Sequence, residues 1–562
     1  MFYEKVKDKK FWKQVRADER YGFLIDQAKA LYEEYGTGDI KALDYDAFMD
    51  YHRTGNRNYF EEKYFSRRKR LVACALLALI YPENGEYLRN LQNTIWAICD
   101  EYCWSLPCHT KSADVLFDDN YLDLFASETG QALSEIRYLL GDRLEVLINE
   151  RIHNEIQHRV IDSFINRTFS WEQNTHNWVA VCGGSIAMTF MLERPDLFDS
   201  VKHRIASAIQ NYIDAFQDDG VCLEGFSYWT YGFGYFCYYA QALLEFTKGE
   251  INLFANEKVK RIAHFPSYAF VSGNASVSFS DGGRVGSLAI GISSLVEYHY
   301  GNILPRLSKE SYRITDHCGR FAEATRAFVF FDPDSFGEIS EPNATHYLKD
   351  SGWFVSKNAR YGFAAKAGHN DEPHNHNDIG SFILAAKGQQ LLCDLGCGAY
   401  TADYFGAKRY TILCNRSMGH SVPILDGQEQ QAGKEFCGTL SYDGSAVTID
   451  MIQAYPSCSV SKLTRRFTLT NDGVTLTDSF GYRNPCPVTE RFISCIAPKQ
   501  NGNTITLGDA TLTCPPGWNC SISTQEHAIH GLYDGSETVY LLDFTPQSQG
   551  ETEFVLTMAL CQ

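Results

Sequence analysis

Several features common in exported, membrane-spanning and metal-finger proteins are missing from this sequence. The N-terminal stretch MFYEKVKDKKFWKQVRADER is charged throughout and contains no apolar segment of the kind found in a secretory signal. The longest apolar run, LVACALLALIY at residues 71–81, is too short to cross a bilayer and predicts a buried helix instead. We therefore expect a cytoplasmic protein that does not bind membranes, or a periplasmic or secreted one if a signal preceded this sequence.

Paired cysteines and positive charge are also lacking. The chain has 18 Cys but no CxxC pair and no zinc-finger spacing. Without a signal sequence, reduced thiols in a cytoplasm are the expected state. The formal net charge of −18 argues against a general nucleic-acid binder. A local basic cleft for an anionic substrate remains compatible with this acidic exterior.

The 562 residues predict more than one domain, in an α+β arrangement, and the spacing of apolar residues divides them. Residues 1–330 have a helical pattern. Apolar side chains recur on one face of 201–216, residues 136–152 follow a similar spacing, and 183–192 are apolar on nearly every side. The basic run SRRKR at 66–70 is expected to be the solvent-facing start of a helix. Successive helix pairs favour a bundle, a solenoid or a toroid.

From about residue 345 onward the pattern changes to alternation. The stretch RRFTLTNDGVTLTDSF at 465–480 alternates on both sides of Asn471-Asp472-Gly473, which is a β-hairpin signal. Further strand-like stretches occur at 503–514, 538–544 and 553–560. We predict an antiparallel β domain over residues 345–562, joined to the helical domain by a linker at 331–344 that contains Pro, Gly and Ser.

The densest polar cluster is GHNDEPHNHNDIGSF at residues 368–382, with three His and three Asn. His376 belongs to it, Asp394 ends a strand-like run, and His420 lies further on in NRSMGHSVPILDG. Two imidazoles and one carboxylate suit Zn²⁺ or Mn²⁺. Because such long spacing carries little specificity, hydrogen-bonded polar residues near loops remain the alternative interpretation.

Two unusual stretches occur in the helical half. WEQNTHNWVAVCGG at 171–184 places Asn and His directly before a helix start rich in small residues. DDGVCLEGFSYWTYGFGYF at 218–236 interleaves aromatic residues with glycines. Two interpretations explain the second stretch equally well. It is either a tightly packed aromatic helix turn or a sugar-stacking wall that leaves one tyrosine hydroxyl free for proton transfer.

Taken together, four ordered blocks resemble the heparinase II/III-type polysaccharide lyases: NTHNWVAVCGG, DGVCLEGFSYWTYGFGYF, HNHNDIGSFILAAKGQQLLCDLG and GHSVPILDG. The resemblance implies an N-terminal incomplete (α/α) toroid followed by a C-terminal antiparallel, β-sandwich-like domain, with the active cleft between them. The implied reaction is β-elimination at a uronic acid, which yields an unsaturated uronate. Glycosaminoglycans such as heparan sulfate, chondroitin or hyaluronan are the implied substrates, with alginate or its oligosaccharides as an alternative.

The resemblance also implies catalytic roles for individual residues. Asn177, with His176 beside it, corresponds to the asparagine that neutralises the uronate carboxylate so that the intermediate is tolerable. Tyr231 corresponds to the tyrosine that protonates the leaving oxygen, and that also acts as base when proton and leaving group are syn. His374 corresponds to the histidine of the β domain, the natural base for the opposite face.

The resemblance also implies a metal site and a set of substrate contacts, beside which two alternative functions remain. His376, Asp394 and His420 match the family's metal site, and the implied Zn or Mn ion is structural. The side chains expected to contact substrate are Glu224, Tyr228, Trp229 and Arg409. The expected partner is an anionic oligo- or polysaccharide, with a homodimer left open. Two rival functions remain. One is a glycan hydrolase that activates water on the metal. The other is a non-catalytic carbohydrate-binding protein, but the presence of the proton-transfer residues argues against it.

Overall fold

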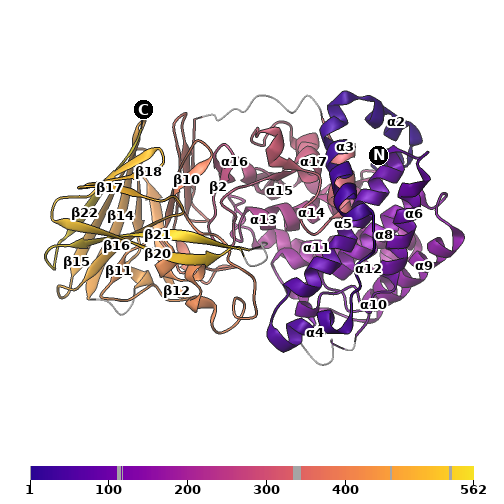
Figure 1. Ribbon diagram of the computed structural model, residues 1–562, viewed down its shortest axis with the longest axis horizontal. Helices are drawn as coiled ribbons and strands as arrows, with labels where there is room; N and C mark the ends of the chain where they lie inside the picture. Colours follow the sequence, from indigo (N-terminus) through magenta and orange to yellow (C-terminus); the bar gives the residue numbers. More distant parts are fainter. Residues whose placement is uncertain are drawn as a thin grey trace.

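The computed structural model describes residues 2–110, 116, 118–332, 343–455, 459–530 and 535–561. Figure 1 shows helices around the N-terminus at one end and strands around the C-terminus at the other. The predicted fold class, a helical region followed by an antiparallel sheet domain, is confirmed. Most of the predicted linker, residues 333–342, lies outside the described residues. Among the described helices, none combines the length and the apolar character needed to cross a membrane.

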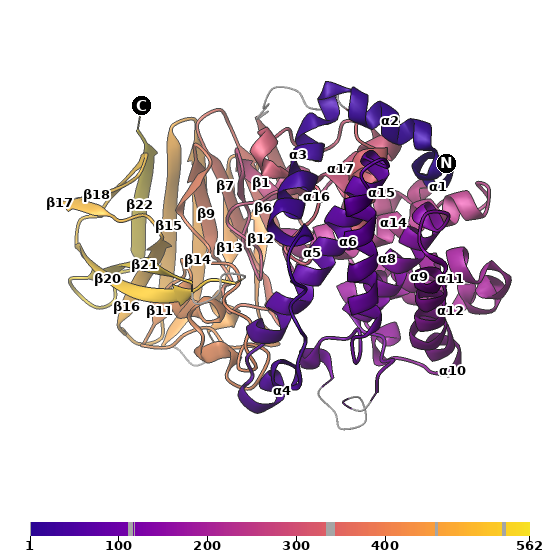
Figure 2. The ribbon, with the colours of Figure 1, turned by 45° about the vertical axis from the view of Figure 1, so that its right-hand side comes forward.

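The helical half is built from helices that pack against one another, both neighbours in the chain and helices further apart. Helix α11 (Asn177–Glu193) contacts α8, α12 and α14, and α5 packs on α6. Figure 2 shows α5, α6, α8 and α9 side by side. The other α-helices are α1 (Phe2–Lys7), α2 (Lys9–Ala17), α3 (Gly22–Leu31), α4 (Tyr45–Thr54), α5 (Asn58–Ile80), α6 (Gly85–Cys99), α8 (Leu124–Leu140), α9 (Val146–Ile156), α10 (Ser163–Asn166), α12 (Pro195–Ala215), α13 (Phe226–Tyr228), α14 (Gly234–Phe246), α15 (Glu257–Ala263), α16 (Phe265–Ala269), α17 (Ile290–Tyr300) and α18 (Phe321–Val329).

The apolar spacing predicts most of these helices but misses one break. Helix α12 buries the predicted face, and α11 is enclosed as expected for a helix that is apolar all round. Residues 136–152 are not one helix, because α8 ends at Leu140 and α9 begins at Val146. The side-chain amide of Asn149 donates to the carbonyls of Gly141 and Leu144, which satisfies backbone groups in the turn between the two helices.

The basic run at 66–70 was expected to face solvent, and this prediction is wrong. It lies inside α5, where Arg67, Arg68 and Arg70 are buried. The Arg68 guanidinium pairs with both carboxylate oxygens of Glu101, at 2.5 and 2.7 Å. Arg70 donates to three backbone carbonyls of the loop 35–38. These arginines hold neighbouring segments onto α5, because a buried guanidinium needs partners for its donors.

Among the described residues, the β domain forms three antiparallel sheets. The five-stranded sheet has the order β10 (Gln389–Leu392), β9 (Phe382–Ala386), β7 (Gly362–Lys366), β6 (Trp353–Lys357) and β5 (Ala344–Leu348). The nine-stranded sheet has the order β17 (Lys499–Asn501), β18 (Thr504–Leu507), β19 (Ala510–Thr513), β22 (Glu553–Leu560), β15 (Gly473–Tyr482), β14 (Val460–Thr470), β13 (Ala446–Asp450), β12 (Gly433–Tyr442) and β8 (Gly368–Asn370). The four-stranded sheet has the order β11 (Ile424–Leu425), β16 (Val488–Ser494), β21 (Ser536–Pro546) and β20 (Trp518–Ala528).

Phenylalanine rings join these sheets into one core. Phe363 of β7 and Phe382 of β9 lie 4.9 and 5.0 Å from the Phe467 ring of β14. Phe492 of β16 lies 5.9 Å from both Phe382 and Phe554 of β22. The predicted hairpin at 465–480 forms between β14 and β15, with Thr470 opposite Gly473 across its turn.

A segment of the helical half lies against the β domain. It contains the short strands β1 (Phe270–Ser272) and β2 (Ala275–Ser276), which the sequence analysis did not predict, and β1 contacts β6, β7 and β9. Figure 2 shows β1 beside β6 and β7. The loop 277–283 that follows β2 approaches the backbone after β10, because a Cβ on Gly396 would lie 1.9 Å from the carbonyl oxygen of Gly282. The chain also forms β3 (Leu288–Ala289) and β4 (Tyr312–Arg313), which pair in parallel.

Candidate active site

His374 lies in the loop between β8 and β9 and connects the two halves of the protein. Its Nδ1 is 2.5 Å from Oδ2 of Asp281, and its Nε2 is 3.6 Å from Oε2 of Glu224. Its ring packs against that of Tyr228 in a tilted arrangement, with the ring centres 4.4 Å apart. Burial opposes protonation, yet the hydrogen bond and the charge of Asp281 raise the pKa of His374 above its ordinary value. A basic imidazole therefore faces the helical half.

Asp281 is the centre of this arrangement, although no sequence pattern predicted a role for it. Its side chain is fully buried and lies 3.0 Å from Nε2 of His376 as well as against His374. The hydroxyls of Tyr400 and Tyr404 donate to the same carboxylate, at 2.8 and 2.5 Å. Burial alone would raise the pKa of Asp281, but the hydrogen bonds from His374 and His376 leave it well below its ordinary value. The local sequence FSDGGR carries only a turn signal, so no pattern pointed to this residue.

The structure brings together the three predicted metal ligands. One ligand atom from each of His376, Asp394 and His420 lies within 4.8 Å of the others, and all three residues are buried. Oδ2 of Asp394 is 2.9 Å from Nδ1 of His420. The residues come from a loop, the end of β10 and a loop before β11, so their proximity depends on the fold.

The donor atoms of this cluster suit a metal ion. Nδ1 of His376 is buried and has no hydrogen-bond partner among the described residues, although such atoms are normally paired. Nε2 of His420 lies 2.7 Å from the carbonyl oxygen of Cys414, which leaves Nδ1 facing Asp394. Metal-bound histidines usually donate their second ring N–H to a carboxylate or a carbonyl, and Asp281 and Cys414 supply these two acceptors.

Asn177 and His176 lie at the start of α11, where backbone N–H groups favour an anion. Asn177 is buried, and its backbone N–H lowers the pKa of the Glu224 carboxyl, against the larger effect of burial. A Cβ on Gly232 would lie 2.9 Å from Cβ of Asn177, so the turn that carries Tyr231 packs directly against it. Burial, with a contribution from His374, lowers the pKa of His176 and keeps this imidazole neutral.

Tyr231 lies on a π-helical turn, Trp229–Phe233, a local geometry that is frequent at functional sites. Its hydroxyl donates to Oε1 of Glu128, and Tyr235 donates to Oε2 at 2.8 Å. Arg320 lies 3.6 Å above the Tyr231 ring and pairs with Glu128 at 2.5 Å. Neither Glu128 nor Arg320 carried a recognisable sequence signal.

The surroundings of Tyr231 favour one of its two predicted roles. Burial and the charge of Glu128 raise the pKa of Tyr231 well above 10, although Arg320 opposes them. A phenolate would face the Glu128 carboxylate, whereas a neutral phenol can turn its proton toward a leaving oxygen. The geometry therefore favours the acid role over the base role.

The two aromatic residues predicted to contact the substrate lie in different surroundings. Trp229 is fully buried, its indole N–H donates to the carbonyl of Ile262 at 2.8 Å, and its ring stacks on Phe226. It cannot stack on a sugar, so this prediction is wrong and the residue belongs to the helical core. Tyr228 is half-buried, and its hydroxyl lies 2.7 Å from that of Tyr400 across the domain junction.

The other two residues predicted to contact the substrate differ in whether protein partners already occupy their polar atoms. Arg409 donates to the carbonyl of Asn375 at 2.9 Å and to that of Tyr404 at 3.0 Å. Its donors hold the loop around His374, so the geometry gives it a structural role in place of the predicted contact. Glu224 is buried, its Oε2 has no hydrogen-bond partner among the described residues, and burial raises its pKa. Glu224 can therefore accept a hydrogen bond from a ligand.

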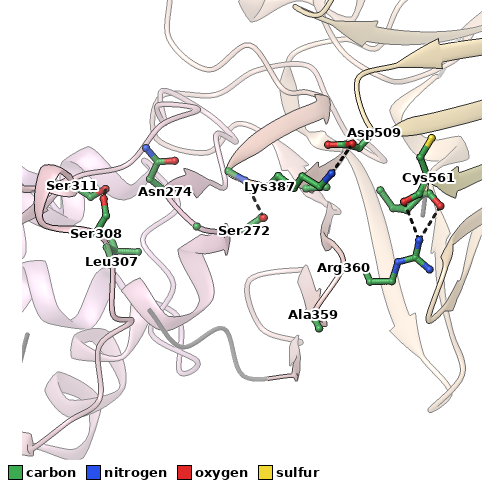
Figure 3. Close-up of a pocket in the computed structure, with 14 residues that line it drawn as sticks. Ser272, Asn274, Leu307, Ser308, Ser311, Ala359, Arg360, Lys387, Asp509 and Cys561 are labelled. Atoms are coloured by element: carbon green, nitrogen blue, oxygen red, sulfur yellow. Dashed lines mark hydrogen bonds and ion pairs between the residues drawn. The ribbon is translucent and has the colours of Figure 1, made fainter. Parts of the chain in front are cut away.

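A separate cavity of about 510 Å³ lies at the other side of the domain junction (Figure 3). None of the predicted site residues lines it. Its charged side chains already have protein partners: Lys387 pairs with Asp509, and Arg360 donates to the carbonyl of Cys561. This cavity has no group poised for the proposed chemistry.

Residues 341–494 match the family model described as heparinase II/III-like, C-terminal. This confirms the resemblance that the four sequence blocks indicated. No curated protein matches the sequence.

Solved structures with the same fold include three lyases. Heparinase III has a TM-score of 0.61 at 12% identity, covering 98% of this chain and 92% of its own. The heparan sulfate lyase HepC from Pedobacter heparinus has a TM-score of 0.58 at 14% identity, with 95% and 87% covered. The chondroitin AC lyase of Streptomyces coelicolor A3, in complex with chondroitin sulphate, has a TM-score of 0.55 at 13% identity, with 100% and 83% covered. At these identities the similarity shows the fold.

Proposed function

We propose that this chain, whose C-terminal domain is heparinase II/III-like, is a polysaccharide lyase that cleaves uronic-acid-containing glycans by β-elimination. One observation carries this proposal: His374 of the β domain and the start of α11 in the helical half both approach Glu224. Nε2 of His374 faces the Glu224 carboxylate at 3.6 Å, and the backbone N–H of Asn177 lowers the pKa of the same group against the effect of burial. Tyr231 lies on the turn that packs against Asn177.

These groups account for each requirement of the elimination. The Asn177 side chain and the N-terminus of α11 stabilise the negative charge that builds on the uronate carboxylate. Nε2 of His374 takes the proton from C5, and the electron pair left behind forms the double bond to C4. The C4–O bond breaks, and the Tyr231 hydroxyl gives its proton to the leaving oxygen. Glu224 accepts a hydrogen bond from a sugar hydroxyl.

His376, Asp394 and His420 would hold a divalent ion, Zn or Mn, with a structural role. The ion would supply a fixed positive charge that ties the loop of His376 to the segments carrying Asp394 and His420. The site's own side chains carry out the proton transfers, and His374 belongs to the same loop, two residues before His376.

The related structures support an anionic polysaccharide as the substrate, because they are a heparan sulfate lyase, a heparinase and a chondroitin lyase. Glycosaminoglycans are therefore the first class to test. Alginate and its oligosaccharides are the alternative, since they present a uronate with the same leaving group on C4.

An ultraviolet-absorbance screen tests the proposal, because the conjugated unsaturated uronate absorbs and a hydrolysis product does not. The panel is heparan sulfate, chondroitin, hyaluronan, alginate and their oligosaccharides. We expect absorbance to grow with at least one of them and to be lost in His374→Gln. New reducing ends without absorbance, abolished by a chelator, would instead identify a metal-dependent hydrolase. Binding without any cleavage would identify a carbohydrate-binding protein.

A further inference from the structure

We propose that Asp281, from the helical half, is a positioning residue that fixes the ring tautomers of two histidines of the β domain, His374 and His376. Through His374 it would orient the base, and through His376 it would orient a metal ligand. The catalytic part of this inference rests on the proposed function, whereas the tautomers themselves do not.

The contacts determine which nitrogen carries the hydrogen. Oδ2 of Asp281 is 2.5 Å from Nδ1 of His374, and Oδ1 is 3.0 Å from Nε2 of His376. An ionised carboxylate can only accept hydrogen bonds, so each of these nitrogens must be an N–H. In a neutral imidazole the opposite nitrogen then carries a lone pair. One carboxylate thus selects opposite tautomers in two rings.

Each lone pair lies where the proposed chemistry needs it. Nε2 of His374 faces Glu224 of the helical half, which is the side from which a substrate proton would be taken. Nδ1 of His376 is buried and has no hydrogen-bond partner among the described residues, and its side chain belongs to the cluster with Asp394 and His420. The reverse tautomers would direct N–H groups at the substrate and at the ion.

The carboxylate is held so that it cannot turn freely. Tyr400 and Tyr404 each donate a hydroxyl to it, at 2.8 and 2.5 Å. The loop of Asp281 is fixed by the close approach of Gly396 to the Gly282 carbonyl and by Ser278, whose hydroxyl donates to the carbonyl of Asp394 at 2.8 Å. Because Asp281 belongs to the helical half and both histidines to the β domain, the base is aligned only when the two halves are docked.

Asp281→Asn is the direct perturbation. An amide offers one oxygen acceptor and one NH₂ donor, so it can accept from only one of the two rings. If the NH₂ faces His374, that ring carries its hydrogen on Nε2 and cannot take a proton. We expect kcat to fall by ~10²–10⁴-fold with KM nearly unchanged. If the NH₂ faces His376, the bound metal measured by elemental analysis falls together with kcat.

Glu135→Gln is the matched control, because Glu135 is similarly buried and its carboxylate accepts hydrogen bonds from Arg326 and Tyr3 of the helical half, neither of them a proposed site residue. It should lower thermal stability while kcat, KM and metal content stay within a few-fold of wild type. A similar loss of kcat in both variants, or unchanged kcat and metal content in a folded Asp281→Asn, would overturn the proposal.

A second measurement needs neither activity nor a folded Asp281 variant. Protein labelled with ¹⁵N-histidine gives imidazole spectra that distinguish the two tautomers at alkaline pH, where the rings are neutral. His374→Gln and His376→Gln assign the signals. We expect Nδ1–H for His374 and Nε2–H for His376, and the opposite tautomer in either ring would refute the inference. If no uronan yields an unsaturated product, the proposed function fails while these spectra still decide the role of Asp281.

Discussion

The two tyrosines on Glu128 provide a controlled test of proton transfer. Tyr231 donates to Oε1 of Glu128 and Tyr235 to Oε2. Replacing either one with Phe removes one hydroxyl and one hydrogen bond to the same buried carboxylate, while the ring remains to fill its space. Only Tyr231, which is half-buried on the turn packed against Asn177, is proposed to reach the substrate.

The structure predicts similar stability costs and very different kinetic costs. A hydrogen bond to a charged group contributes ~1.5–3 kcal/mol, and Glu128 keeps Arg320 as a partner in both variants. Both variants should therefore lose ~1.5–3 kcal/mol in the free energy of unfolding. Tyr231→Phe should also lose ~10²–10⁴-fold in kcat, as expected for a positioned acid, whereas Tyr235→Phe should stay within a few-fold of wild type.

The assay combines thermal or urea unfolding with initial rates of ultraviolet absorbance on whichever uronan wild type cleaves. Oligosaccharide binding by both variants confirms that the site is intact. If Tyr231→Phe turned over within a few-fold of wild type, His374 or His176 would have to carry both proton transfers. If both variants lost kcat equally, the effect would come from Glu128 and its surroundings, and the acid role of Tyr231 would be refuted.

Three further predictions address the metal, the thiols and pH. His420→Ala should lower the metal content, and it should also lower the free energy of unfolding by several kcal/mol, since ion binding is coupled to folding. Full metal occupancy in the variant would contradict His420 as a metal ligand. We expect most of the 18 cysteines to react with a thiol reagent in denaturant without reductant; finding most of them paired would refute this. Burial raises the pKa of Glu323 from 4.5 to about 7. The folded state therefore binds a proton at Glu323 more tightly than the unfolded state does. This group contributes up to about 3 kcal/mol to the free energy of unfolding; the contribution is fully present below pH 4.5 and is lost as the pH rises to 7. Urea unfolding at several pH values should show a slope that is smaller in Glu323→Gln than in wild type, by the contribution of this one group.

The sequence by itself determined the fold class and the residues of several motifs. Apolar spacing predicts α12 and the β14–β15 hairpin, because a helix or a strand buries one face with its own local period. The four ordered blocks predicted the heparinase II/III-like relationship, and their histidines and aspartate included the cluster of His376, Asp394 and His420. These features are legible because they depend on residue type, order and short-range spacing.

The tertiary structure alone decided the environment of each side chain. Asp281 and His374 are 93 positions apart, and Tyr231 and Glu128 are 103 apart, so no local pattern links them. The same holds for burial: Trp229 and Arg68 look like surface residues in a linear reading, yet long-range packing encloses both. Since hydrogen bonding, desolvation and tautomer depend on what surrounds a group in space, the chemistry of these residues follows from how the helical and β halves dock.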